Sequence, residues 1–457
     1  MKPTALSQVL IAAFTCFCCP GLFNALSSVA AGVADESIAY NGSSLLYGFF
    51  AVAGLLAGGV VNVMGPKWAL FLGTWGYVIY AISLLAMDKN HSTVQNDDGT
   101  QAEVYTTGAK TFFYISNSLL GICAGFLWTA QGQMCMAYPT SETKGKYFSW
   151  FWIIFNLGAT MGGLITFGTN YNSQGSSAST TTYIVFLILM SCGCFMSLTL
   201  AKPENVIRND GSVVKVEALP DWKLELIEVA KLFVDPKMLL LFPLFAYSNW
   251  FYTYHSFYNV TIFNSRSGGL ASAFYWGAQM VGAYCIGLYL DAPGGSRKTK
   301  ALKSLGVLTF LISVMWGLGL WAQLSLDLST EHKLGLDFKG GDYWVKLLLY
   351  FYYGLNDAIC QVWSYWLMGQ MSDDLNVLGR YAGYYKGVQS GMSAISWKLG
   401  GINLDPVASL LINWILAAVG LIGAYISIHN YVDDVSGKPE YTSLETPANK
   451  IVDSAVH

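Results

Sequence analysis

Charged residues are scarce in this sequence. Only 12% of its 457 residues are Asp, Glu, Lys or Arg, whereas 54% are hydrophobic. Soluble globular proteins carry roughly 25% charged residues, about twice this share. The shortage of charge therefore excludes an ordinary set of water-soluble domains and favours a chain that lies largely within a membrane.

The signatures of enzymes and of ATP-driven pumps are also missing. The sequence has no nucleotide-binding loop, no metal-ligand set in a loop and no grouping of Ser, His and an acid. Its nine cysteines all fall inside predicted membrane spans, so we expect no disulfide framework. Cys16, Cys18 and Cys19 share one apolar helix and are interpreted as packing residues rather than metal ligands. We expect a protein that is not an enzyme and needs neither a cofactor nor a metal.

What the sequence does contain is a series of apolar stretches about 20 residues long, the length at which a helix crosses the roughly 30 Å hydrocarbon core. We predict twelve spans, at 7–31, 43–63, 67–87, 111–137, 147–168, 181–201, 238–262, 269–290, 302–324, 343–368, 381–401 and 407–429. The third, eleventh and twelfth merge with their flanks, so eleven spans is the alternative. The first span is too long for a signal peptide, and Pro20 and Asn24 interrupt it, so we interpret it as a retained helix.

The distribution of positive charge predicts the orientation. With the N-terminus inside, most of the 25 Lys and Arg residues fall on the inner side. The positive-inside rule then places both termini in the cytoplasm, whether the membrane is the plasma membrane or an internal one. Three sequons, at Asn41, Asn90 and Asn259, all fall on the outer side, where we predict glycosylation.

The longest inner connection divides the spans six and six. We therefore predict an N-terminal six-helix bundle at 1–201, a cytoplasmic linker at 202–237, a C-terminal six-helix bundle at 238–429 and a disordered cytoplasmic tail at 430–457.

An amphipathic helix is predicted within the linker. Trp222, Leu226, Val229 and Phe233 recur at helical spacing. Two alternatives stay open: the helix lies on the inner membrane surface, or it is an ordinary linker helix without lipid contact.

A duplicated pattern supports the six-plus-six division. Gly58-x-x-x-Asn62 follows the second span and Gly287-x-x-x-Asp291 follows the eighth. Gly145-Lys146-Tyr147 and Gly379-Arg380-Tyr381 likewise precede the fifth and eleventh spans, at nearly the same offset. A constant offset is what a duplicated half predicts.

These motifs resemble those of the major facilitator superfamily. Its loop pattern is well preserved in the second half, as Gly287, Asp291, Arg297 and Lys298. In the first half it is degenerate, because Asn62 replaces the acid and only Lys67 follows. The resemblance implies an all-α integral membrane protein with 12 transmembrane helices in two six-helix pseudo-repeats.

More specific stretches resemble the Unc-ninety-three-like ("uncoordinated") family, in its fungal form. They are FNAL at 23–26, LWTAQGQ at 127–133 running on to TSETKGKYFS at 140–149, and GRYAGYYKGVQS at 379–390. The resemblance implies function only weakly. Animal relatives are associated with regulating a potassium channel or escorting innate immune receptors, while many fungal members are described only as candidate transporters.

Polar and aromatic residues align along four spans: the first, fourth, seventh and tenth. In the facilitator fold these four helices line the central cavity, and polar groups at membrane depth usually face protein or water. We expect the substrate cavity to be lined by Asn24, Trp128, Gln131, Tyr254, His255, Tyr353, Asp357 and Gln361. Contact between neighbouring helices is the alternative role, and we favour it for Gln133, which lies about 200° from Gln131 around an ideal helix.

Asp357 is the one carboxylate that we place near mid-membrane, and Lys386 is its candidate partner. Two interpretations compete. The two residues form a structural ion pair, or Asp357 binds a proton or cation during transport and Lys386 adjusts that affinity.

The inner loops supply a predicted cytoplasmic gate. Its residues are Gly58, Asn62, Lys67, Lys146, Gly287, Asp291, Arg297, Lys298 and Arg380. Charge pairs of this kind can lock an inner gate and break when it opens; the alternative is that these cations only set the topology.

Two functions are consistent with these features. The first is a secondary, non-ATP-driven transporter of a small organic solute that works by alternating access, with proton coupling as one option. The second is a non-transporting regulator or chaperone of an ion channel or other membrane protein. Expected partners are the lipid bilayer and a small solute or, in the second case, another membrane protein, and no nucleic acid.

Overall fold

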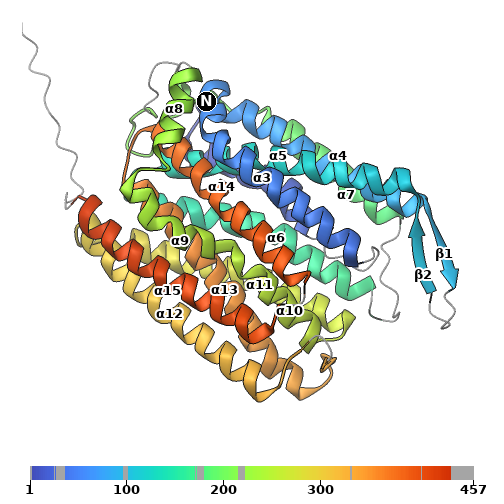
Figure 1. The fold of residues 1–457 in the computed structure, drawn as a ribbon. Coiled ribbons are helices and arrows are strands. Elements are labelled where there is room, and N and C mark those ends of the chain that lie inside the picture. The colour runs from blue at the N-terminus through green and yellow to red at the C-terminus, as the bar shows by residue number, and fades with distance from the viewer. Residues whose placement is uncertain are drawn as a thin grey trace, which may run out of the picture.

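The computed structural model describes residues 3–24, 26, 36–95, 101–169, 171, 180–214, 222–329, 332–402 and 404–433. The predicted tail lies almost entirely outside these residues, as does 215–221 of the predicted linker. Within them the chain folds into long helices that run side by side (Figure 1).

Six spans form the N-terminal half. They are α1 (Ala5–Cys16) continued by the π-helical turn η1 (Phe17–Gly21), α3 (Glu36–Met64), α4 (Pro66–Lys89), α5 (Thr107–Ala137), α6 (Lys144–Thr169) and α7 (Thr180–Ser197). The π-helical turn contains Pro20, which has no N–H to give to a regular helix.

Six further spans form the C-terminal half. The first is broken at Phe251 into α9 (Pro236–Trp250) and α10 (Tyr252–Ile262). The others are α11 (Ser265–Asp291), α12 (Arg297–Ser325), α13 (Gly341–Gln370), α14 (Leu375–Gly400) and α15 (Pro406–Tyr431). Short turns join most of them, whereas a longer segment separates α12 from α13. Side chains such as Ser296 and Asp374 cap the first free N–H groups of the following helix.

Every observed span overlaps its prediction. By length and composition alone, seven of the described helices are apolar enough to cross a membrane, and these include α3, α12 and α15. The remaining spans are shorter, broken or more polar. Among these, α11, α13 and α14 carry the buried polar side chains that meet in the interior.

Two elements lie outside the spans. A hairpin of β1 (His91–Gln95) and β2 (Gln101–Tyr105) projects beyond one end of the bundle, and the sequence did not predict it (Figure 1). At the opposite end lie the 3₁₀ turn η2 (Pro203–Asn205) and the linker helix α8 (Trp222–Lys231). We name the end with α8 the inner end and the end with the hairpin the outer end.

The two halves meet along two helix pairs. α3 packs against α14, and α6 packs against α11. Glycines permit the close approach: a Cβ at Gly58 would lie 2.7 Å from the Cα of Arg380. The central side chains of both halves are therefore held in contact, and the same two pairs bring the inner loops together.

Candidate functional site

Asp357 is the centre of a buried polar network in the C-terminal half. Its carboxylate accepts hydrogen bonds from the Tyr275 hydroxyl at 2.9 Å, from Gln279 Nε2 at 2.7 Å and from Gln361 Nε2 at 2.6 Å. A carboxylate removed from water is costly unless such donors replace its hydration. Three side chains on helices donate to one carboxylate, so the arrangement is specific to this acid.

Lys386 does not pair directly with Asp357. Among the described residues the two form no direct ion pair, which is the contact that the first of the two interpretations requires; the second interpretation stays a prediction. Lys386 Nζ instead donates to Gln389 Oε1 at 2.7 Å, and Gln389 Nε2 donates to Gln361 Oε1 at 3.1 Å. Two amide side chains thus connect the ammonium to the acid.

Aromatic rings surround the Lys386 ammonium. It lies 4.6 Å from the ring centroid of Trp128, 5.2 Å from that of Tyr385 and 5.5 Å from that of Tyr365. The negative faces of aromatic rings attract a cation, most strongly where water is excluded. This attraction explains why a buried lysine can remain apart from the only carboxylate that the prediction placed near mid-membrane.

The N-terminal half reaches this network through aromatic and amide groups. Trp152 Nε1 donates to Gln279 Oε1 at 3.1 Å, and Gln131 Nε2 donates to the Tyr365 hydroxyl at 3.4 Å. Gln131 and Trp128 therefore lie at the interface between the halves, while their predicted role in lining a cavity stays a prediction. The prediction missed Gln279, whose only sequence signal is a lone amide inside an apolar span.

The other predicted cavity residues differ in their contacts. His255 Nδ1 shares a hydrogen bond with the Tyr275 hydroxyl at 3.1 Å, and its ring stacks on Tyr353 at a centroid distance of 4.4 Å. Tyr254 instead turns to α12, where its hydroxyl donates to Gln323 at 3.0 Å. Asn24 is half-buried at the end of the described part of the first span. The structure thus places His255 beside the network and Tyr254 in the packing of the C-terminal half.

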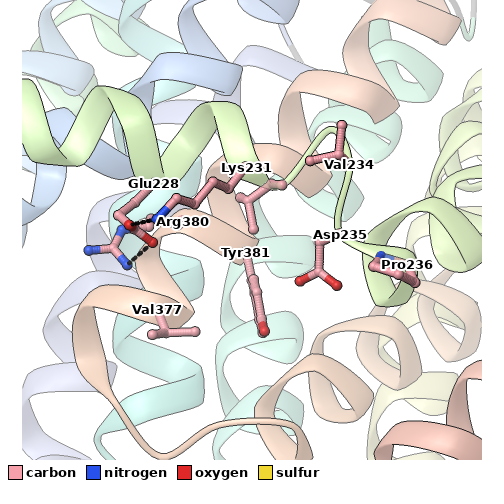
Figure 2. A pocket seen from close by; sticks show the side chains of 9 residues that line it. Glu228, Lys231, Val234, Asp235, Pro236, Val377, Arg380 and Tyr381 are labelled. Carbon is pink, nitrogen blue, oxygen red and sulfur yellow. Dashed lines mark hydrogen bonds and ion pairs between the residues drawn. The ribbon is translucent and has the colours of Figure 1, made fainter.

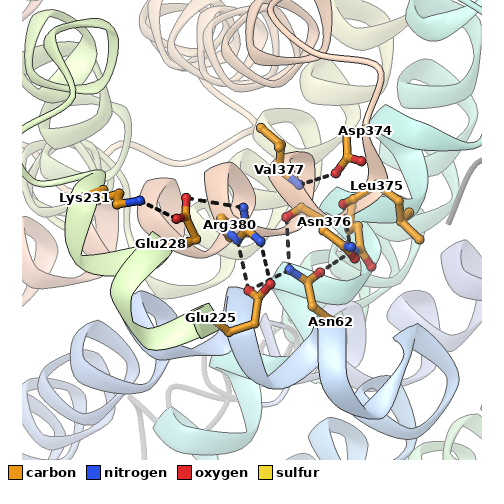
Figure 3. A network of polar contacts seen from close by, with 10 residues as sticks. Asn62, Glu225, Glu228, Lys231, Asp374, Leu375, Asn376, Val377 and Arg380 are labelled. Atoms are coloured by element: carbon orange, nitrogen blue, oxygen red, sulfur yellow. Dashed lines mark hydrogen bonds and ion pairs between the residues drawn. The ribbon is translucent and has the colours of Figure 1, made fainter. Parts of the chain in front are cut away.

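A second network joins α3, α5, α8 and α14 at the inner end (Figure 3). Gln133 Nε2 donates to Asn62 Oδ1 at 2.8 Å and to the Leu375 carbonyl at 3.0 Å. Asn62 Nδ2 donates to the Asn376 carbonyl and to Glu225 Oε2, both at 3.0 Å. Gln133 thus packs between helices of opposite halves.

Arg380 belongs to the same cluster. Its Nε donates to Glu225 Oε2 at 2.9 Å, and a second guanidinium nitrogen contacts the other carboxylate oxygen, which makes a bidentate pair. Gly58 lets the backbone of α3 lie against Arg380. The sequence motifs predicted Asn62, Gly58 and Arg380 as gate residues but gave no signal for Glu225, which lies in the linker and is distant from them in the sequence.

The pseudo-equivalent contact joins α6 and α11. Asp291 accepts hydrogen bonds from the backbone N–H groups of Gly145 at 2.8 Å and Lys146 at 2.6 Å, at the positive end of α6. A Cβ at Gly287 would collide with Ser149. Asp291, Gly287 and Gly145 therefore meet as the motif predicts.

The predicted gate cations behave differently from one another. Arg297 lies 3.7 Å from Asp373, which also lies 3.6 Å from Lys144 of the other half. Lys298 donates to the His429 carbonyl within its own half, at 2.7 Å. The ammonium of Lys67 lies 6.0 Å from the ring of Trp68. Among the described residues, neither Lys67 nor Lys298 forms an ion pair across the halves, and a gating role for these two stays a prediction.

A surface pocket of about 350 Å³ lies beside the second network, between α8 and α14 (Figure 2). Lys231 and Arg380 line it together with Glu228 and Asp235. Lys231 contacts Glu228 at 2.5 Å. The charged side chains of this pocket are thus largely paired with one another. The pocket is therefore a weaker candidate for solute binding than the Asp357 network.

At the outer end, Arg266 connects the halves. Its Nε donates to Asp337 Oδ2 at 2.7 Å, and another nitrogen donates to the carbonyl of Tyr171, which follows α6. The hydrogen bonds from Arg266 and Asn264 hold the pKa of Asp337 well below its usual range. Asp337 therefore orients a guanidinium that bridges the two halves.

The three predicted glycosylation sites differ in access. Asn41 and Asn90 are exposed. Asn259 is half-buried in α10, and its Nδ2 donates to Ser272 and to Tyr350 at 3.0 and 3.1 Å. The first two asparagines are thus better placed to carry a glycan than the third.

A family model and the sequences of known proteins point to the same family. The family described as "Ion channel regulatory protein UNC-93" matches residues 32–93 and 102–287. UNC93-like protein 1 of Arabidopsis thaliana is 38% identical over 441 residues, which cover 94% of this chain and 92% of the relative. An UNC93-like protein of Schizosaccharomyces pombe is 35% identical over 427 residues, which cover 92% of this chain and 81% of the relative.

Solved structures share the fold at low sequence identity. The major facilitator superfamily transporter FucP, in its outward conformation, has a TM-score of 0.61 at 12% identity and covers 92% of this chain and 97% of its own. A bacterial homologue of the iron transporter ferroportin, in an outward-facing state, has a TM-score of 0.63 at 9% identity and covers 93% and 99%. These similarities show a multi-pass membrane protein of the major facilitator fold.

Proposed function

Since the chain belongs to the UNC-93 family and has the major facilitator fold, we propose that it is a secondary transporter of a small organic solute that works by alternating access. The observation that carries the proposal is the Asp357 network, a buried acid with three donors at the interface of two six-helix halves. Amides and tyrosines dominate this network. They suit an organic solute that offers hydrogen-bonding groups and an apolar body.

Contacts at both ends support alternating access. The Glu225–Arg380 pair and the Asp291 contacts join the halves at the inner end, and Arg266 joins them at the outer end. Contacts between rigid halves that break and re-form are the usual basis of such gating. Under this proposal, the intact inner network corresponds to a closed inner gate.

Proton coupling is the finer part of the proposal. Asp357 accepts hydrogen bonds from neutral donors. The side-chain amides of Gln361 and Gln389 lie between it and Lys386. An acid held without a directly bound cation can gain and lose a proton as the solute binds and leaves. Asp357→Asn mimics the protonated form and should uncouple solute movement from the proton gradient.

The test compares solutes retained by cells that express the wild-type chain, Asp357→Asn or Gln131→Ala, each with and without a protonophore. We expect one solute to change with the wild type, and that change to fall about tenfold or more in Asp357→Asn, as for loss of a charge-assisted contact. The protonophore should change wild-type flux and leave the residual Asp357→Asn flux unaltered.

A matched control removes a buried amide away from the network. Asn413 is buried in α15 and donates to the Ser409 carbonyl of its own helix. Asn413→Ala should reach the membrane in the same amount and transport as the wild type does. Equal flux in Asp357→Asn, Gln131→Ala and the wild type would contradict the assignment of the central site.

The second candidate is a regulator or chaperone of an ion channel or other membrane protein. The description of the matched family favours it. A regulator would co-purify with one membrane partner, and the retained solutes would not change with expression. Flux that depends on Asp357 would exclude this as the sole function.

A further inference from the structure

Glu225 is a buried carboxylate on a helix that is exposed along most of its length. Only 1% of its surface is accessible, although α8 contains just ten residues. Its oxygens accept hydrogen bonds from Arg380 Nε at 2.9 Å and from Asn62 Nδ2 at 3.0 Å (Figure 3). An acid in this position requires both partners, since burial of an unpaired carboxylate is strongly unfavourable.

The pseudo-repeat shows what this carboxylate replaces. In the second half, Asp291 ends α11 and binds the first turn of α6. The corresponding residue of the first half is the uncharged Asn62, two residues before the end of α3. Glu225 lies within hydrogen-bonding distance of Asn62 and forms the bidentate pair with Arg380. The linker therefore supplies the acid that the first-half motif lacks.

The depth of α8 places it on the flank of the bundle rather than across its tip. A Cβ at Gly59 would lie 3.4 Å from the Cβ of Glu225, and Gly59 is more than one turn from the end of α3. Further along, Phe233 contacts Tyr384 at a ring-centroid distance of 5.4 Å, more than two turns inside α14. α8 therefore lies alongside the inner turns of α3 and α14.

The face of α8 turned away from the bundle combines apolar side chains with the exposed Lys223 and Lys231, a mixture typical of interfacial helices. Trp222, Leu224, Leu226 and Ile227 are 47 to 60% exposed. Exposed apolar side chains continue on either side, with Val63 at the inner end of α3 and Leu239 at the start of α9. Apolar surface of the spans, which faces lipid in any membrane protein of this fold, therefore borders the exposed face of α8 on both sides.

We propose that α8 lies in the inner interface of the lipid bilayer and that this contact holds Glu225 in the gate between α3 and α14. The membrane surface is the partner: Trp222, Leu224, Leu226 and Ile227 enter it, as the apolar face of an interfacial helix does. The opposite face of α8 places the Glu225 carboxylate against Asn62 and Arg380. This inference concerns the gate and does not depend on which solute is transported.

The first experiment measures where α8 lies. A nitroxide is attached at Ile227→Cys in the full-length chain, with the exposed cysteines Cys192 and Cys285 changed to Ser, in lipid nanodiscs. Relaxation by oxygen, which concentrates in lipid, is compared with relaxation by a water-soluble nickel complex. Controls carry the label at Ser212 in an exposed inner loop and at Ile188 on the exposed apolar face of α7.

We expect the label at position 227 to respond more to oxygen than to nickel, between the two controls. A response equal to that of position 212 would place α8 in water and overturn the proposal. Protection from both reagents would mean that protein covers the helix, which would overturn it as well.

The second experiment measures the gate. Cys135 is fully buried one turn from Gln131, so its alkylation by a water-soluble maleimide reports opening of the inner end. We expect Glu225→Gln to raise alkylation of Cys135 several-fold, and Leu224→Gln with Ile227→Gln to do the same. Val213→Gln, which changes an exposed apolar residue of the inner loop, is the matched control.

The Glu225→Gln variant and the double variant test the carboxylate and the membrane contact separately. If the double variant matches Val213→Gln while Glu225→Gln opens the gate, the membrane contact does not hold the gate and the proposal fails. If Glu225→Gln itself leaves Cys135 protected, the carboxylate has no gating role and the proposal also fails.

Discussion

At the scale of single residues, the central site separates its two charges instead of pairing them. Asp357 is satisfied by a tyrosine and two glutamines, while Lys386 is held by three aromatic rings and Gln389. Each charge therefore has its own shell of neutral groups. A solute that carries hydrogen-bonding groups could exchange with these amides without breaking an ion pair.

The contact between Lys386 and Trp128 is the first testable feature at this scale. It joins α14 of one half to α5 of the other at 4.6 Å. A double-mutant cycle with Lys386→Met and Trp128→Leu should give a coupling energy of about 0.5–2 kcal/mol, the range of cation–π contacts. Thermal or denaturant unfolding of the four purified proteins measures it.

Lys386→Arg is the control for charge, since a guanidinium also binds aromatic faces. It should retain part of the coupling with Trp128. A coupling energy of zero in the Met series would show that the rings pack around Lys386 without binding its charge.

At the scale of helices, the halves approach one another through glycine. Gly58 of α3 lies against the α14 backbone at Arg380, whereas a Cβ at Gly48 on the same helix would meet no neighbouring atom within 4 Å. A methyl group thus has no room at one position and ample room at the other. The pair offers a comparison within one helix.

Gly58→Ala should push α3 away from α14 at the inner end and weaken the Glu225–Arg380 pair. We expect a loss of roughly 1–3 kcal/mol in stability, as for an overpacked core, together with faster alkylation of Cys135. Gly48→Ala should be neutral or slightly stabilising, because alanine favours the helix by about 1 kcal/mol over glycine.

Thermal unfolding of both variants in the same detergent, beside the wild type, measures the difference. Equal melting temperatures for Gly58→Ala and Gly48→Ala would mean that α3 and α14 are not in close contact at Gly58.

At the scale of the whole molecule, both ends hold the halves together, but with different chemistry. The inner end uses an acid from the linker and an acid from α11. The outer end uses Arg266, which Asp337 orients towards Tyr171. Only a rearrangement that breaks one set while keeping the other gives alternating access.

The outer contact should depend on pH in one direction. The pKa of Asp337 in the folded protein is lowered by its hydrogen bond from Arg266. A carboxylate of this kind stabilises the fold above its unfolded pKa and loses that contribution as the pH falls through the lowered folded value. Asp337→Asn should therefore destabilise the protein at pH 7, and its difference from the wild type should shrink as the pH drops below about 4.

Melting temperatures of the wild type and Asp337→Asn across this pH range measure the effect. Asp327→Asn is the control, because Asp327 is a loop carboxylate with a positive φ of 46°, which asparagine also tolerates. A difference between Asp337→Asn and the wild type that stays constant with pH would show that the Asp337 charge does not contribute.

Much of the fold was determined by the sequence alone. Twelve spans, their order and the family follow from apolar length and from motifs such as those at Gly287 and Gly379, because a helix in lipid must satisfy its own backbone and keep apolar side chains outward. The same local rules placed Gln131 and Asp357 in the interior, where polar groups find partners. The β1–β2 hairpin escaped prediction because its strands are short and outside the membrane pattern.

Tertiary structure alone decided which polar groups meet. The pattern of α8 suggested an apolar face that includes Val229, yet Val229 is buried on the same side as Glu225 and the exposed face is formed by Trp222, Leu224, Leu226 and Ile227. Likewise, the similar depths of Asp357 and Lys386 in their spans suggested an ion pair as one interpretation. In the structure, Gln361 and Gln389 lie between the two charges. Periodicity fixes which residues share a face of one helix, whereas the partner of that face depends on how distant helices pack, and only the folded chain brings Glu225 to Arg380.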